Sequence, residues 1–207
     1  MKQILTIIVS LFSILSWGQY NCQDLKSNSK ISIGSINNNG KSDTIDILHY
    51  HIDFDATRVV SKQISATTEI TFTPKMNGVD HLALDLLKLS IDSITPATLI
   101  SNYSYNDTII SINLSTNTNI GDTTVLSVFY HGSPQGDASG WGGWHSDAPY
   151  YYNLGVGFGA DSHTYRRAWF PCFDNFIEKS TYSFKITTEG GRKAYCNGMR
   201  TDFQVIS

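Results

Sequence analysis

Residues 165–182 read YRRAWFPCFDNFIEKSTY, and this stretch decides how the rest of the chain is interpreted. It places paired arginines, a Pro-Cys step, an aspartate and a Glu-Lys pair in one short loop that leads into a strand pattern. A guanidinium group matches a carboxylate bidentately. We therefore predict that Arg166 or Arg167 pairs with Asp174 and that Pro171 fixes the turn between them. With Lys179, these residues form a structural set, an interpretation we prefer to an acid–base catalytic cluster.

Apolar and polar residues alternate on both sides of this loop, as strands with one buried and one wet face require. The apolar rows run, in chain order, from Leu48 to Phe54, Ile64 to Phe72, Leu82 to Leu86, Leu89 to Ile94, Ile110 to Leu114, Leu126 to Tyr130 and Tyr182 to Ile186. The turn residues Pro74–Gly78 predict an antiparallel hairpin between the second and third rows.

Many short strands without helical periodicity predict an all-β domain over residues 43–207, either an antiparallel β-sandwich or a curved, saddle-like sheet. A short strand is expected about Tyr195, and alternation continues through Phe203 and Val205 to Ser207. A strand that stopped there would leave a sheet edge uncovered. We therefore expect the domain to be incomplete at its C-terminal end.

The first 19 residues predict a secretory signal peptide. One basic residue, Lys2, precedes an uncharged run of 12 residues from Ile4 to Leu15, and small residues follow. The run is shorter than the roughly 20 residues that span a bilayer, so no transmembrane anchor is expected. Residues 20–42 are mostly polar and predict a flexible lead-in. The expected location is the periplasm, the cell surface or the extracellular space.

Composition limits the partners. The formal charge of −3 and the scattered basic residues provide no basic field, so nucleic-acid binding is not expected. About 188 residues would remain after the signal peptide, enough for one sizeable domain.

Three cysteines would enter an oxidising compartment. Cys172 and Cys196 flank a strand and turn, so we predict a disulfide between them, which would stabilise the domain by roughly 3 kcal/mol. Cys22 would be left over. No cysteine-protease signature surrounds any of the three.

Several segments resemble a known family in the same order along the chain. Residues 165–182 are similar to a signature of the aminopeptidase N family of zinc metallopeptidases, whose non-catalytic N-terminal domain carries the form A-R-x-x-F-P-C-F-D-E-P-x-x-K-A-T-F. Phe129–Gly132 and Gly140–Trp144 resemble the family's aromatic-Tyr-x-Gly strand end and the glycine-aromatic loop after it. Cys196–Gly198 resembles the Asn-Gly that closes the following hairpin. The resemblance covers roughly residues 46–198.

This resemblance implies the N-terminal domain of an exported, aminopeptidase-like zinc metallopeptidase that hydrolyses peptides from the N-terminus. The implied partners are a downstream catalytic domain of the same polypeptide and a peptide substrate, and zinc is the implied cofactor of the parent. The resemblance also implies a loop that reaches toward the substrate cleft, formed by Gly155, Val156, Gly157, Phe158 and Gly159. Many aminopeptidases place a Gln shortly upstream of the arginines to bind the substrate amine, and residues 157–161 contain none.

The catalytic residues of the family are missing from this sequence. Its zinc motif is H-E-x-x-H, and none of the six histidines is followed by Glu. The family's G-x-M-E-N segment is also absent, since Gly198-Met199-Arg200 lacks the glutamate. We therefore expect this chain alone to be non-catalytic and to bind no metal. His49 and His51 could be half of a metal site, but a wet strand face explains them more simply.

An alternative is a secreted carbohydrate-binding or adhesin-type β-sandwich. Flat aromatic faces stack on sugar rings, and Trp141, Trp144 and Tyr150–Tyr152 are candidates for such a platform. The ordered run of matches through Phe170–Asp174 favours the peptidase domain.

Overall fold

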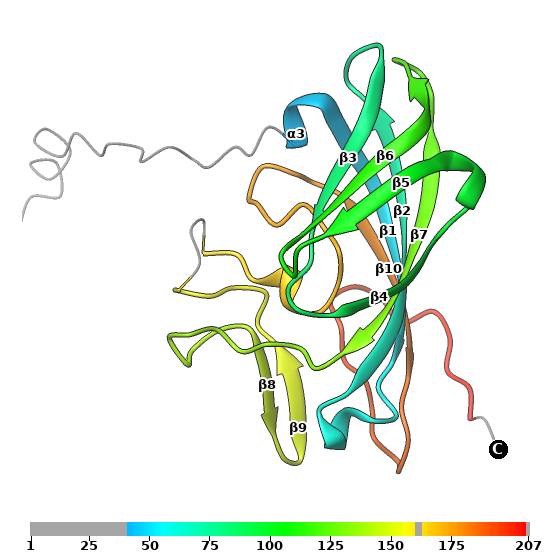
Figure 1. Cartoon of the computed structure of the whole chain (residues 1–207). Helices are drawn as coiled ribbons and strands as arrows, with labels where there is room; N and C mark the ends of the chain where they lie inside the picture. The colour runs from blue at the N-terminus through cyan, green and yellow to red at the C-terminus, as the bar shows by residue number, and fades with distance from the viewer. Residues whose placement is uncertain (1–40, 160–162, 206–207) are drawn as a thin grey trace, which may run out of the picture. The chain divides into compact units, whose positions relative to one another are not determined.

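The computed structural model describes residues 41–159 and 163–205, and strands dominate them (Figure 1). The predictions for the signal peptide and Cys22 concern residues outside these ranges. The elements are α3 (Lys41–Thr44), β1 (Ile45–Asp55), η1 (Val59–Ser61), β2 (Ile64–Pro74), β3 (Val79–Asp85), β4 (Ser90–Thr95), η2 (Ala97–Leu99), β5 (Ile100–Tyr105), β6 (Ile109–Thr118), β7 (Thr124–Gly132), β8 (Trp144–Asp147), β9 (Tyr150–Asn153), η3 (Arg166–Ala168) and β10 (Thr181–Thr187). None of the described helices has the length and apolarity to span a bilayer.

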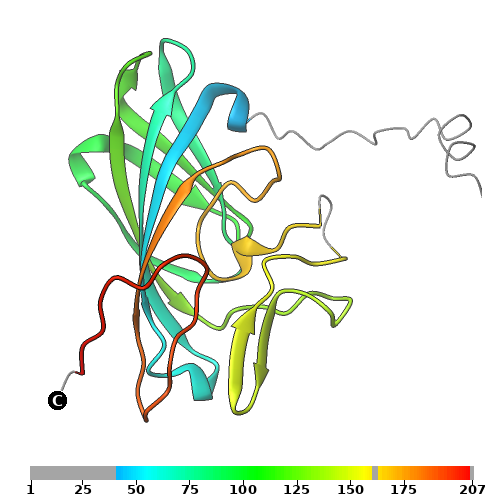
Figure 2. The same cartoon turned by 180° about the vertical axis from the view of Figure 1, so that it is seen from behind.

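Three sheets make up the fold. The largest has the strand order β10-β1-β2-β7-β4, the second has the order β3-β6-β5, and β8 pairs with β9. Every pairing is antiparallel except that of β1 with β10. In Figures 1 and 2 the three-stranded sheet covers one half of the long sheet, and the β8–β9 hairpin lies beside the other half. The predicted all-β fold is confirmed.

Most of the predicted apolar rows form the core. The rows of β2, β3, β6 and β7 are buried between the two larger sheets, as period-two alternation requires. Phe54 of β1 continues the core toward the β8–β9 hairpin, where its ring lies 5.9 Å from that of Trp144. At about 25 cal/mol per Å² of apolar surface, burial of these rows is the main stabilising contribution.

The row predicted for β1 is wrong at its first residue. Leu48 is 40% exposed, whereas its neighbour Ile47 is fully buried. The pairing of β1 with β2 shifts register between Ile47 and His49. A β-bulge inserts one extra residue and reverses the faces on one side of it. The buried row therefore begins with Ile45 and Ile47 and resumes at Tyr50.

The predicted hairpin between β2 and β3 does not form. β2 pairs with β1 and β7, while β3 pairs with β6 in the other sheet. If β2 and β3 were paired in one sheet, their apolar rows would lie on the same face of that sheet, and neither row could cover the other. Turn residues 75–78 instead lead the chain from one sheet to the other, so that the two apolar rows pack against each other.

The strand predictions near the C-terminus are also wrong. No strand is assigned between residues 188 and 205, and Tyr195, Phe203 and Val205 are exposed. A strand is stabilised by its ladder hydrogen bonds and by burial of one face. Within the described residues this segment has neither.

Polar side chains fasten the edge strand β10 to β1. Thr181 donates its hydroxyl hydrogen to the Leu48 carbonyl, so it accepts from His49 Nδ1 at 2.7 Å. The hydroxyl oxygen of Ser183 lies within hydrogen-bond distance of both His49 Nε2 and His51 Nδ1, at 2.8 Å from each. The two histidines on the polar face of β1 thus have specific partners, which are the hydroxyl groups of β10. Among the described residues, no three His, Cys, Asp or Glu side chains lie close enough to hold a metal ion.

The bulge predicts opposite outcomes for two adjacent substitutions. We expect Ile47→Ala to lower the free energy of unfolding by about 2–5 kcal/mol, because it leaves a cavity in the core. Leu48→Ala should change it by less than about 1 kcal/mol, because that side chain lies largely in solvent. Urea denaturation of both variants measures the difference. A larger loss for Leu48→Ala would show that the register is the unshifted one.

Candidate functional site

Residues 163–178, which we call the clasp loop, are anchored in the core although they form no strand. Phe170 and Phe173 are buried, and Cys172 makes two backbone hydrogen bonds with Asp85 at the end of β3. The backbone N–H of Phe173 donates to the Tyr50 hydroxyl at 3.0 Å. The loop is therefore held from both larger sheets, by β3 on one side and by β1 on the other.

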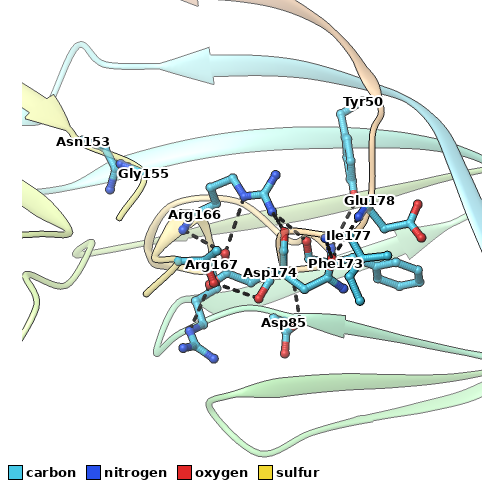
Figure 3. Close-up of polar contacts among 12 residues, drawn as sticks. Tyr50, Asp85, Asn153, Gly155, Arg166, Arg167, Phe173, Asp174, Ile177 and Glu178 are labelled. Atoms are coloured by element: carbon cyan, nitrogen blue, oxygen red, sulfur yellow. Dashed lines mark hydrogen bonds and ion pairs between the residues drawn. The ribbon is translucent and has the colours of Figure 1, made fainter. Parts of the chain in front are cut away.

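Asp174 lies at the centre of this loop with its side chain fully buried (Figure 3). Arg166 Nε is 3.6 Å from Oδ1, and Arg167 Nε is 3.1 Å from Oδ2. The backbone N–H of Arg166 also donates to Oδ1 at 3.2 Å. Oδ2 accepts no hydrogen bond from the described residues, so Arg167 acts on it through charge rather than as an aligned donor. Both predicted partners thus lie within ion-pair distance of the carboxylate.

A second buried carboxylate lies beside the first. Asp85 pairs with Lys41 of α3 at 2.6 Å, and both side chains are less than a tenth exposed. Its other oxygen accepts the backbone N–H of Asp174 at 3.1 Å. Lys41, Asp85, Arg166, Arg167 and Asp174 together form what we call the charge cluster. It joins α3, β3 and the clasp loop.

Sequence reasoning missed Lys41 and Asp85. Lys41 was assigned to the flexible lead-in of residues 20–42, but with Ser42 it belongs to α3 and is buried. Asp85 alternates with Leu84 and Leu86, a pattern that indicates a wet face. No local signal links two residues 44 positions apart, so only the fold shows that they pair.

Burial dominates the electrostatics of the clasp loop. Burial has the largest effect on Asp174, whose pKa is raised although the charges of Arg167 and Arg166 lower it, and Asp85 raises it as well. Burial likewise raises the pKa of the Cys172 thiol, which is therefore protonated and a poor nucleophile. These shifts indicate structural groups.

The predicted disulfide is absent. Both Cys172 and Cys196 are free thiols. Cys172 is enclosed in the core beneath the clasp loop, whereas Cys196 is exposed in the segment that failed to form a strand. A disulfide needs its two Cα atoms within about 7 Å, and a hairpin that would bring them together does not form.

The remaining members of the predicted structural set differ in their contacts. Arg166 also donates to the Phe173 carbonyl and the Tyr182 hydroxyl, both at 3.2 Å, and to the Asn175 carbonyl. Pro171 is buried. Lys179 is exposed and makes no ion pair with a described residue. The side chain of the neighbouring residue, Glu178, is buried instead, and its carboxylate lies 3.5 Å from Lys75 Nζ.

The glycine-rich loop Gly155–Gly159 borders a hollow of about 160 Å³ next to the clasp loop. The hollow is lined by Trp141, Val156, Gly157, Phe158, His163 and Phe176. The rings of Trp141 and Phe158 are 4.6 Å apart, and both are more than half exposed. The predicted cleft residues thus form an apolar surface.

Part of the aromatic platform considered for sugar binding is structural. Trp144 and Tyr151 pack against the core, so they are unavailable as stacking faces. On the opposite face of the hairpin, Tyr152 stacks on His145 with 4.8 Å between ring centroids, and Tyr150 is exposed. The platform is therefore smaller than the sequence indicated.

Comparison with known proteins agrees with this architecture. A family profile described as Peptidase M1 N-terminal domain matches residues 46–204. The fold and the clasp loop thus define the class as the β-domain of a metallopeptidase. The chain belongs to the M1 peptidase N-terminal domain family. No curated protein sequence gives a significant match.

Solved structures share the fold. An M1 zinc metallopeptidase from Deinococcus radiodurans is 19% identical with a TM-score of 0.59, covering 70% of this chain and 32% of that one. A point mutant from the same organism bound to a Tyr-Ser-Ala substrate is 20% identical with a TM-score of 0.60, covering 70% and 33%. A two-domain M1 zinc metallopeptidase mutant bound to L-tryptophan is 20% identical with a TM-score of 0.59, with the same coverage. The present chain spans about a third of their length.

Removal of the central carboxylate tests the charge cluster. We expect Asp174→Ala to lower the free energy of unfolding by about 2–4 kcal/mol, because it leaves the Arg166 backbone N–H without its acceptor and two guanidinium groups without their counter-charge. Asp174→Asn should cost less, because its amide oxygen can still accept from Arg166. Exposed Asp80 provides the control, and Asp80→Ala should be nearly neutral. Equal stability of Asp174→Ala and the unmodified chain would contradict the clasp.

The raised pKa of Asp174 predicts a pH dependence with a definite sign. The folded state holds the proton more tightly than the unfolded chain, whose carboxyl pKa is about 3.9. Stability therefore falls as the pH rises from that value through the folded-state pKa. We expect the unmodified chain to gain stability relative to Asp174→Asn between pH 7 and pH 4. Urea denaturation at both pH values measures the change, and a relative loss would contradict it.

Proposed function

We propose that this chain is the domain that borders the substrate cleft in an exported, aminopeptidase-like zinc peptidase, and that it performs no hydrolysis by itself. The observation that carries the proposal is the family match over residues 46–204 together with the missing H-E-x-x-H motif. Family membership supports the reaction class, and the missing motif supports a place for the chemistry elsewhere in the polypeptide.

The described residues of this chain do not fit a zinc site. The sequence lacks the family's motif, and the described residues offer no group of three His, Cys, Asp or Glu side chains. We assign zinc and the general base to a downstream catalytic domain, which is the proposed partner. The neighbours of similar fold are about twice as long as this chain, which supports that assignment.

Two structural features support a role at the cleft. The glycine-rich loop presents the apolar groups of Val156 and Phe158 at the hollow, and these suit an apolar side chain of a peptide better than a polar ligand. The clasp loop beneath it is fixed by buried charges. A fixed wall can orient a substrate without contributing a reacting group.

Export is proposed from residues 1–19, whose short apolar run and small C-terminal residues match a signal peptide. The two free thiols are compatible with an oxidising compartment only because one is enclosed in the core. The prediction is a mature protein that begins near Gln19 or Tyr20.

The non-catalytic assignment is tested on the purified chain. We expect less than about 0.1 zinc per chain by elemental analysis and no release of product from amino-acid arylamides, since the zinc motif is missing. A polypeptide from the same reading frame that includes downstream sequence should hold one zinc ion and hydrolyse the amino-acid arylamides. One zinc ion bound per purified chain would overturn the assignment. Glycan binding by the chain, with an inactive longer polypeptide, would favour the carbohydrate-binding alternative.

A further inference from the structure

The carboxylate of Asp137 lies under the glycine-rich loop and is itself only 6% exposed as a residue. It accepts the backbone N–H of Phe158 at 2.9 Å and that of Gly159 at 3.1 Å. It also accepts the backbone N–H and the hydroxyl of Ser139. Two segments about 20 residues apart in sequence therefore meet on one buried side chain.

Among the described residues, no cation neutralises this carboxylate. No described Lys, Arg or His lies within ion-pair distance of Asp137, so its charge is stabilised by N–H and O–H groups alone. The Ser139 hydroxyl has the largest effect, and with the N–H groups of Gly159 and Phe158 it lowers the pKa of Asp137 despite partial burial. An ionised carboxylate is a pure acceptor, which suits a position faced only by donors.

The neighbouring glycines show how closely the chain must approach this side chain. A Cβ at Gly159 would lie 2.7 Å from Asp137 Oδ1, and one at Gly157 would lie 3.0 Å from its Cγ. Gly143 has a φ of +77°, and a Cβ there would lie 2.6 Å from the Asp137 backbone nitrogen. Contacts under 3.0 Å force a rearrangement. Glycine at these positions and aspartate at 137 thus specify one loop conformation together.

The hydrogen bonds fix what the loop displays. Gly143 N–H donates to the Val156 carbonyl at 2.9 Å, and the Asp137 N–H donates to the Gly142 carbonyl at 2.9 Å. With Phe158 held through its own N–H, its ring lies against Trp141 and forms a wall of the apolar hollow. Release of the Phe158 and Gly159 amides would allow this wall to move.

We propose that Asp137 is a positioning residue for substrate binding: its carboxylate holds Gly155–Gly159 in the conformation that presents Val156 and Phe158 to the peptide. This inference rests on the proposed function, because it assumes that the glycine-rich loop borders the cleft. It goes beyond that function by naming the group that sets the shape of the wall. Asp137 touches no reacting atom and acts through the loop.

The test is Asp137→Asn, which keeps the size of the side chain but turns an amide N–H toward backbone donors. In the full chain, we expect hydrogen exchange at the Phe158 and Gly159 amides to accelerate at least tenfold, with exchange in β1 and β2 unchanged. Asp147→Asn is the matched control, because Asp147 is an exposed carboxylate on the neighbouring hairpin. Unchanged exchange at Phe158 and Gly159 would overturn the proposal, and this readout needs no enzymatic activity.

A second readout separates positioning from mere folding. In the longer polypeptide that hydrolyses peptides, Asp137→Asn should raise KM for a peptide by about fivefold or more while changing kcat by less than twofold, because it weakens contacts that are made equally in the ground state and the transition state. Asp137→Glu keeps the charge but is one methylene longer, so it should restore part of the KM. Faster exchange with an unchanged KM would show that the loop does not border the cleft. An inactive unmodified polypeptide would refute the proposed function and leave the exchange result standing.

Discussion

The rest of the domain depends on the burial of two carboxylates, Asp85 and Asp174, in one place. Neither can be buried charged without compensation. Lys41 compensates Asp85, and the two arginines of the clasp loop compensate Asp174. Because Asp85 also accepts the Asp174 N–H, the two pairs form one unit. The start of the described chain, the end of β3 and the clasp loop must therefore assemble together.

This constraint separates two roles that the sequence presents together. A stretch rich in Arg, Cys, Asp, Glu and Lys looks like a catalytic cluster, but its carboxylate is enclosed and its thiol is held in the neutral form. The surface that can meet a ligand lies next to it, on the glycine-rich loop. There the carboxylate of Asp137 accepts hydrogen bonds from backbone N–H groups. The domain thus uses ionised side chains to fix the backbone and leaves apolar groups exposed at the hollow.

Most of the fold could be predicted because a half-buried strand leaves a period of two, as Ile64–Phe72 and Leu126–Tyr130 show. The failures have physical causes. The bulge after Ile47 has no signature in the sequence. The placement of β2 and β3 in different sheets depends on which apolar rows pack against each other, and this is set by the whole fold. The Arg–Asp proximity followed from residue chemistry. Lys41, Asp85 and Asp137 could not be found, because their partners are distant in sequence and their local patterns are those of surface residues.

A double-mutant cycle between Asp85 and Asp174 tests the central claim most directly. The free energies of unfolding of the unmodified chain, Asp85→Asn, Asp174→Asn and the double variant would be measured at one pH. If the two carboxylates form one unit, the losses are not additive: each charge makes ionisation of the other less favourable, so the double variant loses more stability than the sum of the single losses, by at least about 0.5 kcal/mol. Additive losses would mean that the clasp loop and the Lys41–Asp85 pair are independent, and would contradict the account.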